Sequence, residues 1–195
     1  MKLAMSYIFQ CFALSIFILI VFFTSGSCAT YRYSDGTPYA ATLTFTGERL
    51  GRDVTFDHLP KFEDFPAAPA VKTTAKDIDW KSHPRAWEFR TRLREGLKAP
   101  ANFGGAYSVV SHGCGSGCQA HWIIHRANGR VLGMFYTTAG AVFDNNSRLI
   151  IANLPDRTAD LSDGWGLLDE VVFYAAKNDT LVQIQRIDVT NLPDR

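Results

Sequence analysis

The chain has little net charge and little cysteine. It carries 20 Lys and Arg against 19 Asp and Glu, a formal net charge of +1, and only 4 Cys among 195 residues. The charges are interspersed, with no basic stripe of the kind that follows a nucleic-acid backbone, so we expect no nucleic-acid partner. No phosphate loop, dinucleotide fingerprint or His-Glu-x-x-His motif occurs either. The ordinary composition also argues against disordered, collagen-like and coiled-coil classes, which leaves a globular domain.

The N-terminus has the order of features that is typical of a secretory signal peptide. Lys2 precedes an apolar run over 7–23, and small residues follow it. Cleavage at small residues would make 1–29 the signal peptide, whereas a permissive lipobox would end the signal at 27 and leave Cys28 as a lipidated N-terminus. The run also just reaches the length of an uncleaved membrane anchor. We therefore predict an exported protein of the periplasm or cell envelope, with membrane contact only through such an anchor or a lipid.

Export would place the other cysteines in an oxidising compartment. Either cleavage removes Cys11 and removes or modifies Cys28, so that Cys114 and Cys118 remain as one pair. These two lie in Gly-Cys-Gly-Ser-Gly-Cys, where glycines leave room for a tight ring. We predict a disulfide between Cys114 and Cys118, which would fix the shape of a Gly-rich loop at the edge of a sheet.

The mature chain, about 165 residues long, suits one domain with a single core. Prolines and turn residues mark 30–70 as a turn-rich N-terminal arm, and 71–195 reads as an α+β domain packed with it. Apolar residues at helical spacing predict one main amphipathic helix over about 83–98. The buried stripe of this helix would consist of Ala86, Phe89, Leu93 and Leu97.

The rest of the domain reads as an antiparallel β-sheet meander on which this helix packs. Apolar runs predict a strand over 71–80 and several more after the helix, with hairpin turns at Asn128-Gly129 and Asn178-Asp179. The segment Asn-Leu-Pro-Asp-Arg occurs at 153–157 and again at 191–195. Two copies are fewer than repeat architectures need, so a partial propeller-like all-β sheet stays as the alternative fold.

The cysteine loop is the one local pattern that points to a site. A rigid, exposed loop at a sheet edge is typical of binding elements. The candidate binding loop comprises His112, Gly113, Gly115, Ser116, Gly117, Gln119, His121 and Trp122. The alternative is a zinc site formed by His112, Cys114, Cys118 and His121, or a reactive thiol at the same place. Both need free thiolates, and the cysteine spacing matches neither common zinc patterns nor Cys-x-x-Cys.

The segment that carries this loop resembles a group of uncharacterised bacterial exported proteins. The likeness rests on Asn-Phe-Gly-Gly-Ala-Tyr at 102–107, which matches the Asn-Phe-x-Gly-x-Tyr strand of that group, followed by Gly-Cys-Gly-Ser-Gly-Cys-Gln at 113–119. The helix before it and the strand start at Ser147-Arg148 are also similar. The resemblance covers roughly 60–190 and implies export from a bacterial cell, but it implies no activity and no catalytic residue.

From these features we expect a non-catalytic binding or interaction module of the cell envelope, rather than an enzyme. Its partner would be an envelope protein or a small ligand, and it would need no cofactor. The alternative hypothesis is an enzyme or a metal-binding protein with a thiol and histidine centre at the same loop, zinc being the cofactor in that case.

Overall fold

A computed structural model describes residues 31–33, 38–47, 50, 52–156, 158–160 and 169–192. The predicted signal segments 1–29 and 1–27, with Cys28, lie outside these residues, as does the end of the second Asn-Leu-Pro-Asp-Arg copy. Within the described part of the chain, no helix is both long and apolar enough to cross a membrane.

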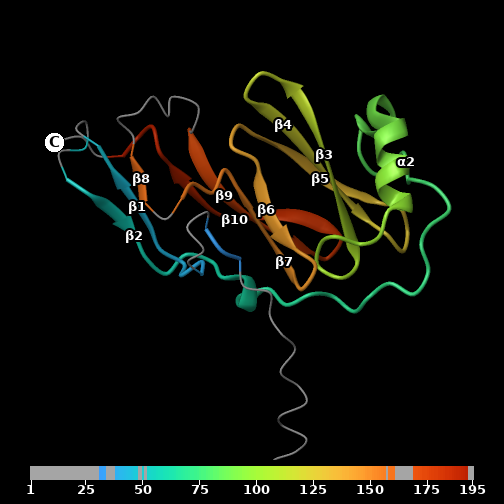
Figure 1. The fold of residues 1–195 in the computed structure, drawn as a ribbon. Helices are drawn as coiled ribbons and strands as arrows, with labels where there is room; N and C mark the ends of the chain where they lie inside the picture. Colours follow the sequence, from blue (N-terminus) through green and yellow to red (C-terminus); the bar gives the residue numbers. More distant parts are fainter. Residues whose placement is uncertain are drawn as a thin grey trace, which may run out of the picture.

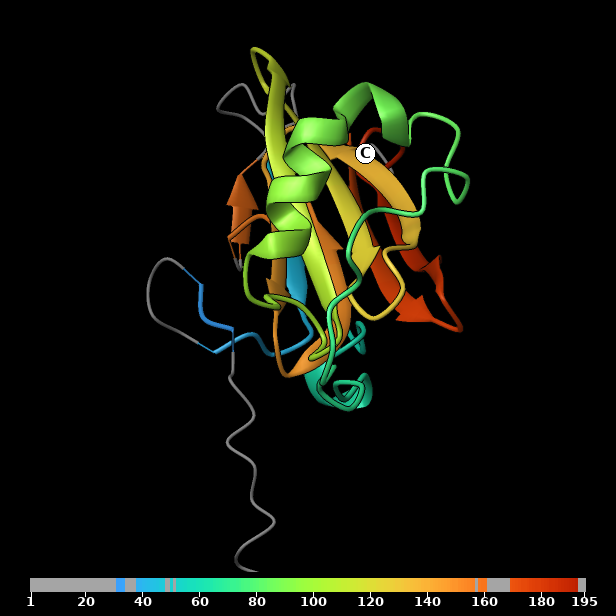
Figure 2. The same ribbon diagram turned by 90° about the vertical axis from the view of Figure 1, so that its right-hand side faces the viewer.

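Three β-sheets and one short helix are stacked as layers (Figure 1). The first sheet has the order β2-β1-β8 and consists of β1 (Leu43–Thr46), β2 (Val54–Phe56) and β8 (Thr158–Asp160). The second has the order β10-β9-β7-β6 and consists of β6 (Ala141–Asp144), β7 (Ser147–Ala152), β9 (Glu170–Lys177) and β10 (Thr180–Asp188). The third has the order β3-β4-β5 and consists of β3 (Tyr107–Gly115), β4 (Cys118–His125) and β5 (Val131–Thr137). The helix α2 (Arg90–Lys98) covers the outer face of the third sheet (Figure 2).

The strand pairs are antiparallel except for β1 with β8, so the chain is mostly antiparallel β-sheet with one short helix. The α+β class is therefore correct at this level of detail. Stacked layers differ from the radial blades of the propeller-like alternative. The segment predicted as a turn-rich arm contributes β1, β2 and a 3-10 helix at Phe62–Asp64, all of which lie on the second sheet's side of the molecule.

The central strands of the second sheet, β7 and β9, are buried on both faces because they lie between two other layers. Leu149 and Ile151 of β7 pack with the arm and the first sheet, whereas Ile150 and Ala152 pack with the third sheet. Successive side chains of a strand point to opposite faces, so these four consecutive apolar residues can fill two different cores. A third core joins the outer face of the third sheet to α2.

The helix is shorter than the predicted 83–98. A 3-10 helix over Ala86–Phe89 leads into α2, and the two helices together span 13 residues. Ser82 lies where it could cap a helix that begins at 83, but its hydroxyl instead lies 2.5 Å from Asp79 O and accepts a 2.8 Å hydrogen bond from Val131 N. The buried stripe is nonetheless as predicted, with Ala86, Leu93 and Leu97 buried and Phe89 half-buried.

The strand predicted over 71–80 is wrong. This segment is a strap outside the sheets, joined to the third sheet by a single bridge between Asp79 and Arg130. Ala75 N and Asp79 N donate to the carbonyls of Arg126 and Gly129 in the β4–β5 connection, but no ladder forms. The Asp77 carboxylate accepts from Ile78 N and Trp80 Nε1 and is held at 2.8–2.9 Å by Arg94 of α2. Such side-chain bonds to the nearby backbone compete with strand pairing. The strand β6 was not predicted.

Both predicted hairpin turns are confirmed. Asn178 and Asp179 have positive φ angles of 50° and 58°, as a two-residue turn between β9 and β10 requires. Gly129 has φ +72° in the connection between β4 and β5, where a Cβ atom would collide with the Asp77 carbonyl of the strap. The glycine is therefore needed for the turn and for the close approach of the strap.

Candidate functional site

The predicted disulfide lies at the tip of the β3–β4 hairpin. Cys114 and Cys118 are bonded, with Cα atoms 5.1 Å apart, across a two-residue connection between the strands. The residues from Gly113 to Gly117 are exposed, and a Cβ atom placed on Gly113 or Gly115 would have no neighbour within 4 Å. The tip projects beyond the neighbouring strands (Figures 1 and 2). The loop is thus exposed and covalently closed, as the sequence predicted.

The base of this hairpin is held by the first residue of the Asn-Phe-Gly-Gly-Ala-Tyr segment. The Asn102 side chain donates to Val109 O at 3.0 Å and accepts from Val109 N at 2.8 Å, so that its amide pairs with the backbone of β3. Phe103 is fully buried beneath the same strand. These residues of the resemblance motif therefore have a structural role, which is to anchor β3.

The candidate loop residues divide between the two faces of the sheet. Half-buried His112 faces α2, with its ring centroid 4.9 Å from that of Phe89. Trp122 is fully buried on the same face, 4.9 Å from Phe89 and 5.1 Å from His83. His121 is buried on the opposite face. His121 and Trp122 therefore lie in the core and not on the predicted contact surface, because both neighbouring layers cover β4.

The buried His121 is held between two hydroxyl groups. Its Nδ1 lies 2.7 Å from Ser111 Oγ and its Nε2 lies 2.8 Å from Thr137 Oγ1. The pKa of His121 is lowered to about 4, mainly by burial and to a smaller extent by the neighbouring His112. The imidazole is therefore neutral at pH 7, which allows one ring nitrogen to donate and the other to accept. The sequence indicated neither Ser111 nor Thr137.

The four residues of the zinc hypothesis are not gathered around one point. Cys114 and Cys118 bond each other, and both nitrogens of His121 are occupied by hydroxyl groups. His112 pairs across the strands with Ala120 and His121 with Ser111, and neighbouring register positions face opposite sides of a sheet. Only the two cysteines are thus brought together as the sequence suggested.

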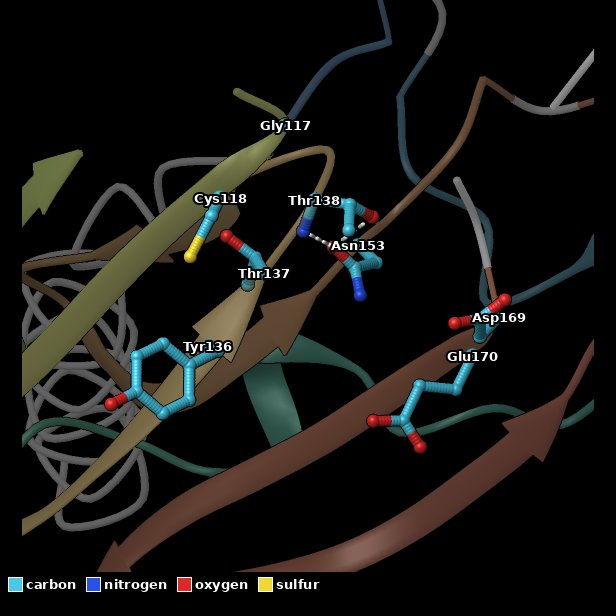
Figure 3. A pocket seen from close by; sticks show the side chains of 8 residues that line it. All are labelled: Gly117, Cys118, Tyr136, Thr137, Thr138, Asn153, Asp169 and Glu170. Carbon is cyan, nitrogen blue, oxygen red and sulfur yellow. Dashed lines mark hydrogen bonds between the residues drawn. The ribbon is translucent and has the colours of Figure 1, made fainter. Parts of the chain in front are cut away.

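A pocket of about 220 Å³ opens beside the tip of the hairpin (Figure 3). It lies where the tip, the end of β5, the turn after β7 and the start of β9 meet. The pocket is lined by Gly117, Cys118, Tyr136, Thr137, Thr138, Asn153, Asp169 and Glu170. The candidate loop thus contributes Gly117 to this pocket, together with Cys118 of the disulfide, and other elements contribute the rest.

Asn153 is one of the pocket residues that sequence reasoning missed. It directly follows β7 and has a positive φ of 56°, which asparagine tolerates better than most residues. The signal that could have found it is the first position of the repeated Asn-Leu-Pro-Asp-Arg segment, an asparagine immediately after an apolar strand. A turn residue of this kind commonly has a backbone role, and only the tertiary structure places its side chain in a pocket.

No family model, no curated protein and no solved structure matches this chain. Its function is therefore inferred from the disulfide-closed hairpin tip and the pocket beside it.

Proposed function

We propose that this chain is a non-catalytic binding protein of the cell envelope that recognises its partner with the β3–β4 hairpin tip and the pocket beside that tip. The observation that carries this proposal is an exposed Gly-rich tip that is closed by a disulfide. The tip adds no side chain to the three buried cores, so the bridge is not needed to cover them.

A disulfide at this place has a clear use in binding. A free Gly-rich loop would lose about 1–2 kcal/mol of backbone entropy per residue on being ordered by a partner. The bridge between Cys114 and Cys118 restricts the loop beforehand, so more of the interaction energy appears as affinity. The hydrogen bonds of Asn102 to Val109 stiffen the base of the same hairpin.

The chemistry of the loop supports binding better than thiol or metal catalysis. A nucleophilic cysteine or a zinc ligand has to be a thiolate, and both sulfurs are in the disulfide. His121 could serve as the base of a hydroxyl nucleophile such as Ser111, but the pKa of about 4 makes its imidazole a weak base.

Site-specific photo-crosslinking in the native host tests this proposal. A photoreactive residue in place of exposed Ser116 should yield a specific adduct, to be identified by mass spectrometry. The control is the same residue in place of Lys72, which is exposed on the strap. Replacing Cys114 and Cys118 by serine should weaken the Ser116 adduct several-fold.

The cysteine double variant remains folded in this experiment. The bridge closes a ring of only five residues, which is worth about 2 kcal/mol in the unfolded-chain model, within the 5–15 kcal/mol typical of a domain. The proposal fails if Ser116 gives no adduct, if Lys72 gives the same adduct, or if the double variant reacts as fully as the natural chain.

A further inference from the structure

Asn153 provides the pocket with a hydrogen-bond donor of fixed orientation. The side chain is only 5% exposed, and its Oδ1 accepts from the backbone N–H groups of Thr138 at 2.8 Å and Ala139 at 3.0 Å. Two donors on one atom identify it as the oxygen, so Nδ2 points the other way, into the pocket (Figure 3). Among the described residues, none accepts a hydrogen bond from this Nδ2. A ligand oxygen would satisfy it.

The opposite side of the pocket carries hydrogen-bond acceptors. Asp169 and Glu170 lie across from Asn153 at the start of β9 (Figure 3). The Glu170 carboxylate is 2.5 Å from Arg186 Nε, so the guanidinium already balances its charge and fixes its position. Carboxylates in this setting accept hydrogen bonds from ligand hydroxyl groups. A cation fits less well, because the N–H dipole of Asn153 points into the same space.

Hydroxyl groups line the side of the pocket between these two walls. Thr137 Oγ1 is 2.8 Å from His121 Nε2, and Thr138 Oγ1 is 3.4 Å from Asn153 Oδ1. Neutral His121 can either donate to Thr137 or accept from it, with Ser111 taking the complementary role at Nδ1. Thr137 is only 3% exposed and its hydroxyl is engaged with His121, so on this side of the pocket the Thr138 hydroxyl is the one left for a ligand.

The end of β5 closes the pocket on one side. Tyr136 borders the pocket there, but its ring lies on the α2 face of the third sheet: Tyr136 pairs across the strands with Ala120, and its hydroxyl accepts a 2.9 Å hydrogen bond from Arg85 Nη1. The pocket volume of about 220 Å³ equals the space of about seven water molecules. This is below the range of drug-sized ligands and suits a single small ring.

We infer that this pocket binds one hydroxyl-rich sugar unit, either free or at the end of a glycan. A sugar offers hydroxyl donors for Asp169 and Glu170 and oxygen acceptors for Asn153. This inference rests on the proposed binding function and names the ligand class for the pocket half of that site.

Chemical-shift titration of the isotope-labelled mature protein tests the inference. The probes are glucose, N-acetylglucosamine, maltotetraose and chitotetraose, with choline and Ca²⁺ as cationic comparisons. We expect saturable shifts for Tyr136, Thr138 and Asn153 with at least one sugar. A free sugar as ligand gives equal affinity for monomer and tetramer, whereas a glycan end gives tighter binding of the tetramer.

Two variants and one matched control make the test specific. Asn153→Asp keeps the Oδ1 acceptor and a residue that tolerates positive φ, but it replaces the inward donor by an acceptor. Asp169→Asn exchanges one carboxylate acceptor of the pocket for a donor. Each should weaken sugar binding at least tenfold. Asp53→Asn makes the same exchange at an exposed position that is not part of the pocket lining, and should leave binding unchanged.

The inference is overturned if no sugar shifts these residues, if only choline or Ca²⁺ does so, or if Asp53→Asn weakens binding as much as Asp169→Asn. Should Asn153→Asp fail to fold, the comparison of Asp169→Asn with Asp53→Asn decides the matter alone. Failure here is distinct from failure of the proposed function: Ser116 adducts without sugar binding leave the hairpin role intact, and sugar binding without Ser116 adducts restricts recognition to the pocket.

Discussion

His121 shows how this protein keeps a polar side chain within its core. The ring is 2% exposed, stacks on Phe135 at 4.9 Å, and gives both nitrogens to hydroxyl groups on the flanking strands β3 and β5. A buried imidazole with both hydrogen bonds made is tolerated, but a buried imidazolium would lose solvation without gaining a counter-ion. Stability should therefore depend on pH through this residue.

The free energy of unfolding should fall as the pH drops from about 6.5 to 4. The pKa of His121 is about 4 in the folded chain against 6.5 ordinarily, so the unfolded chain binds the proton first. The loss should be on the order of 3 kcal/mol, since each pKa unit corresponds to about 1.4 kcal/mol. Full stability should be present above pH 6.5. Urea unfolding at several pH values measures this dependence.

His121→Gln is the control, because glutamine does not titrate. The slope of stability against pH should become much shallower between pH 6.5 and 4. A remainder of the same sign should come from His83 and His112, whose pKa values are also lowered by burial. Asp77, whose pKa is lowered by hydrogen bonds from Arg94, loses its contribution only below this window. An unchanged slope in the variant would contradict the assignment to His121.

At the scale of elements, α2 fits the third sheet through one glycine. A Cβ atom at Gly96 would collide with Val110 Cγ2 on β3. Leu93 and Leu97 on either side of this contact are buried, so the helix backbone approaches the sheet most closely between them. The sequence predicts the apolar stripe correctly, but the need for a glycine depends on the distance between two elements.

Gly96→Ala should therefore destabilise the protein, although the same change stabilises most helices by about 0.5–1 kcal/mol. Overpacking at this contact should cost about 1–3 kcal/mol in urea unfolding. Adding Val110→Ala should restore part of that loss, since it removes the colliding methyl groups. Glu95→Ala, at the neighbouring exposed position, should stay within about 0.5 kcal/mol of the natural chain. A stabilised Gly96→Ala variant would show that α2 packs less closely.

For the whole molecule, the middle sheet couples the layers on either side. The core with the arm includes Leu149 and Phe173, and the core with the third sheet includes Ile150 and Val172, so β7 and β9 contribute to both. Two cores that share the same strands cannot lose packing independently. We expect the described layers to unfold in one cooperative transition.

Phe62→Ala tests this coupling from the arm. Phe62 is buried and packs against Tyr39 with ring centroids 5.9 Å apart, so its truncation should cost about 3–5 kcal/mol. The readout is tryptophan fluorescence in a Trp165→Phe background, which reports Trp80, Trp87 and Trp122 near α2. Because the layers are coupled, fluorescence and far-UV circular dichroism should shift to the same lower midpoint. An unshifted fluorescence transition would show that the arm unfolds separately.

Local patterns account for the parts of the fold that were predicted. Asn178-Asp179 sets a hairpin turn by its own backbone preferences, and the disulfide follows from two cysteines four residues apart. The segment 71–80 was misjudged for the converse reason. Its apolar residues suit a strand, but the Asp77 carboxylate bonds to the adjacent backbone and to Arg94. The bond to Arg94 joins residues 17 apart in the chain, and no local pattern reveals it.

The candidate site divides in the same way. Its hairpin tip was visible in the sequence because glycine and cysteine spacing is a local property. The pocket was not, because Tyr136, Asn153 and Asp169 come from three separate strand ends that meet only after the sheets stack.

The sequence by itself thus determined the mainly antiparallel chain, the helix stripe, the turns and the disulfide, since period, turn preference and ring closure act over a few residues. Only the tertiary structure decided that four consecutive apolar residues of β7 serve two cores, that His121 and Trp122 are buried, and that Asn153 points into a pocket. These outcomes depend on which layers cover each face, and that is settled by contacts between residues far apart in the chain.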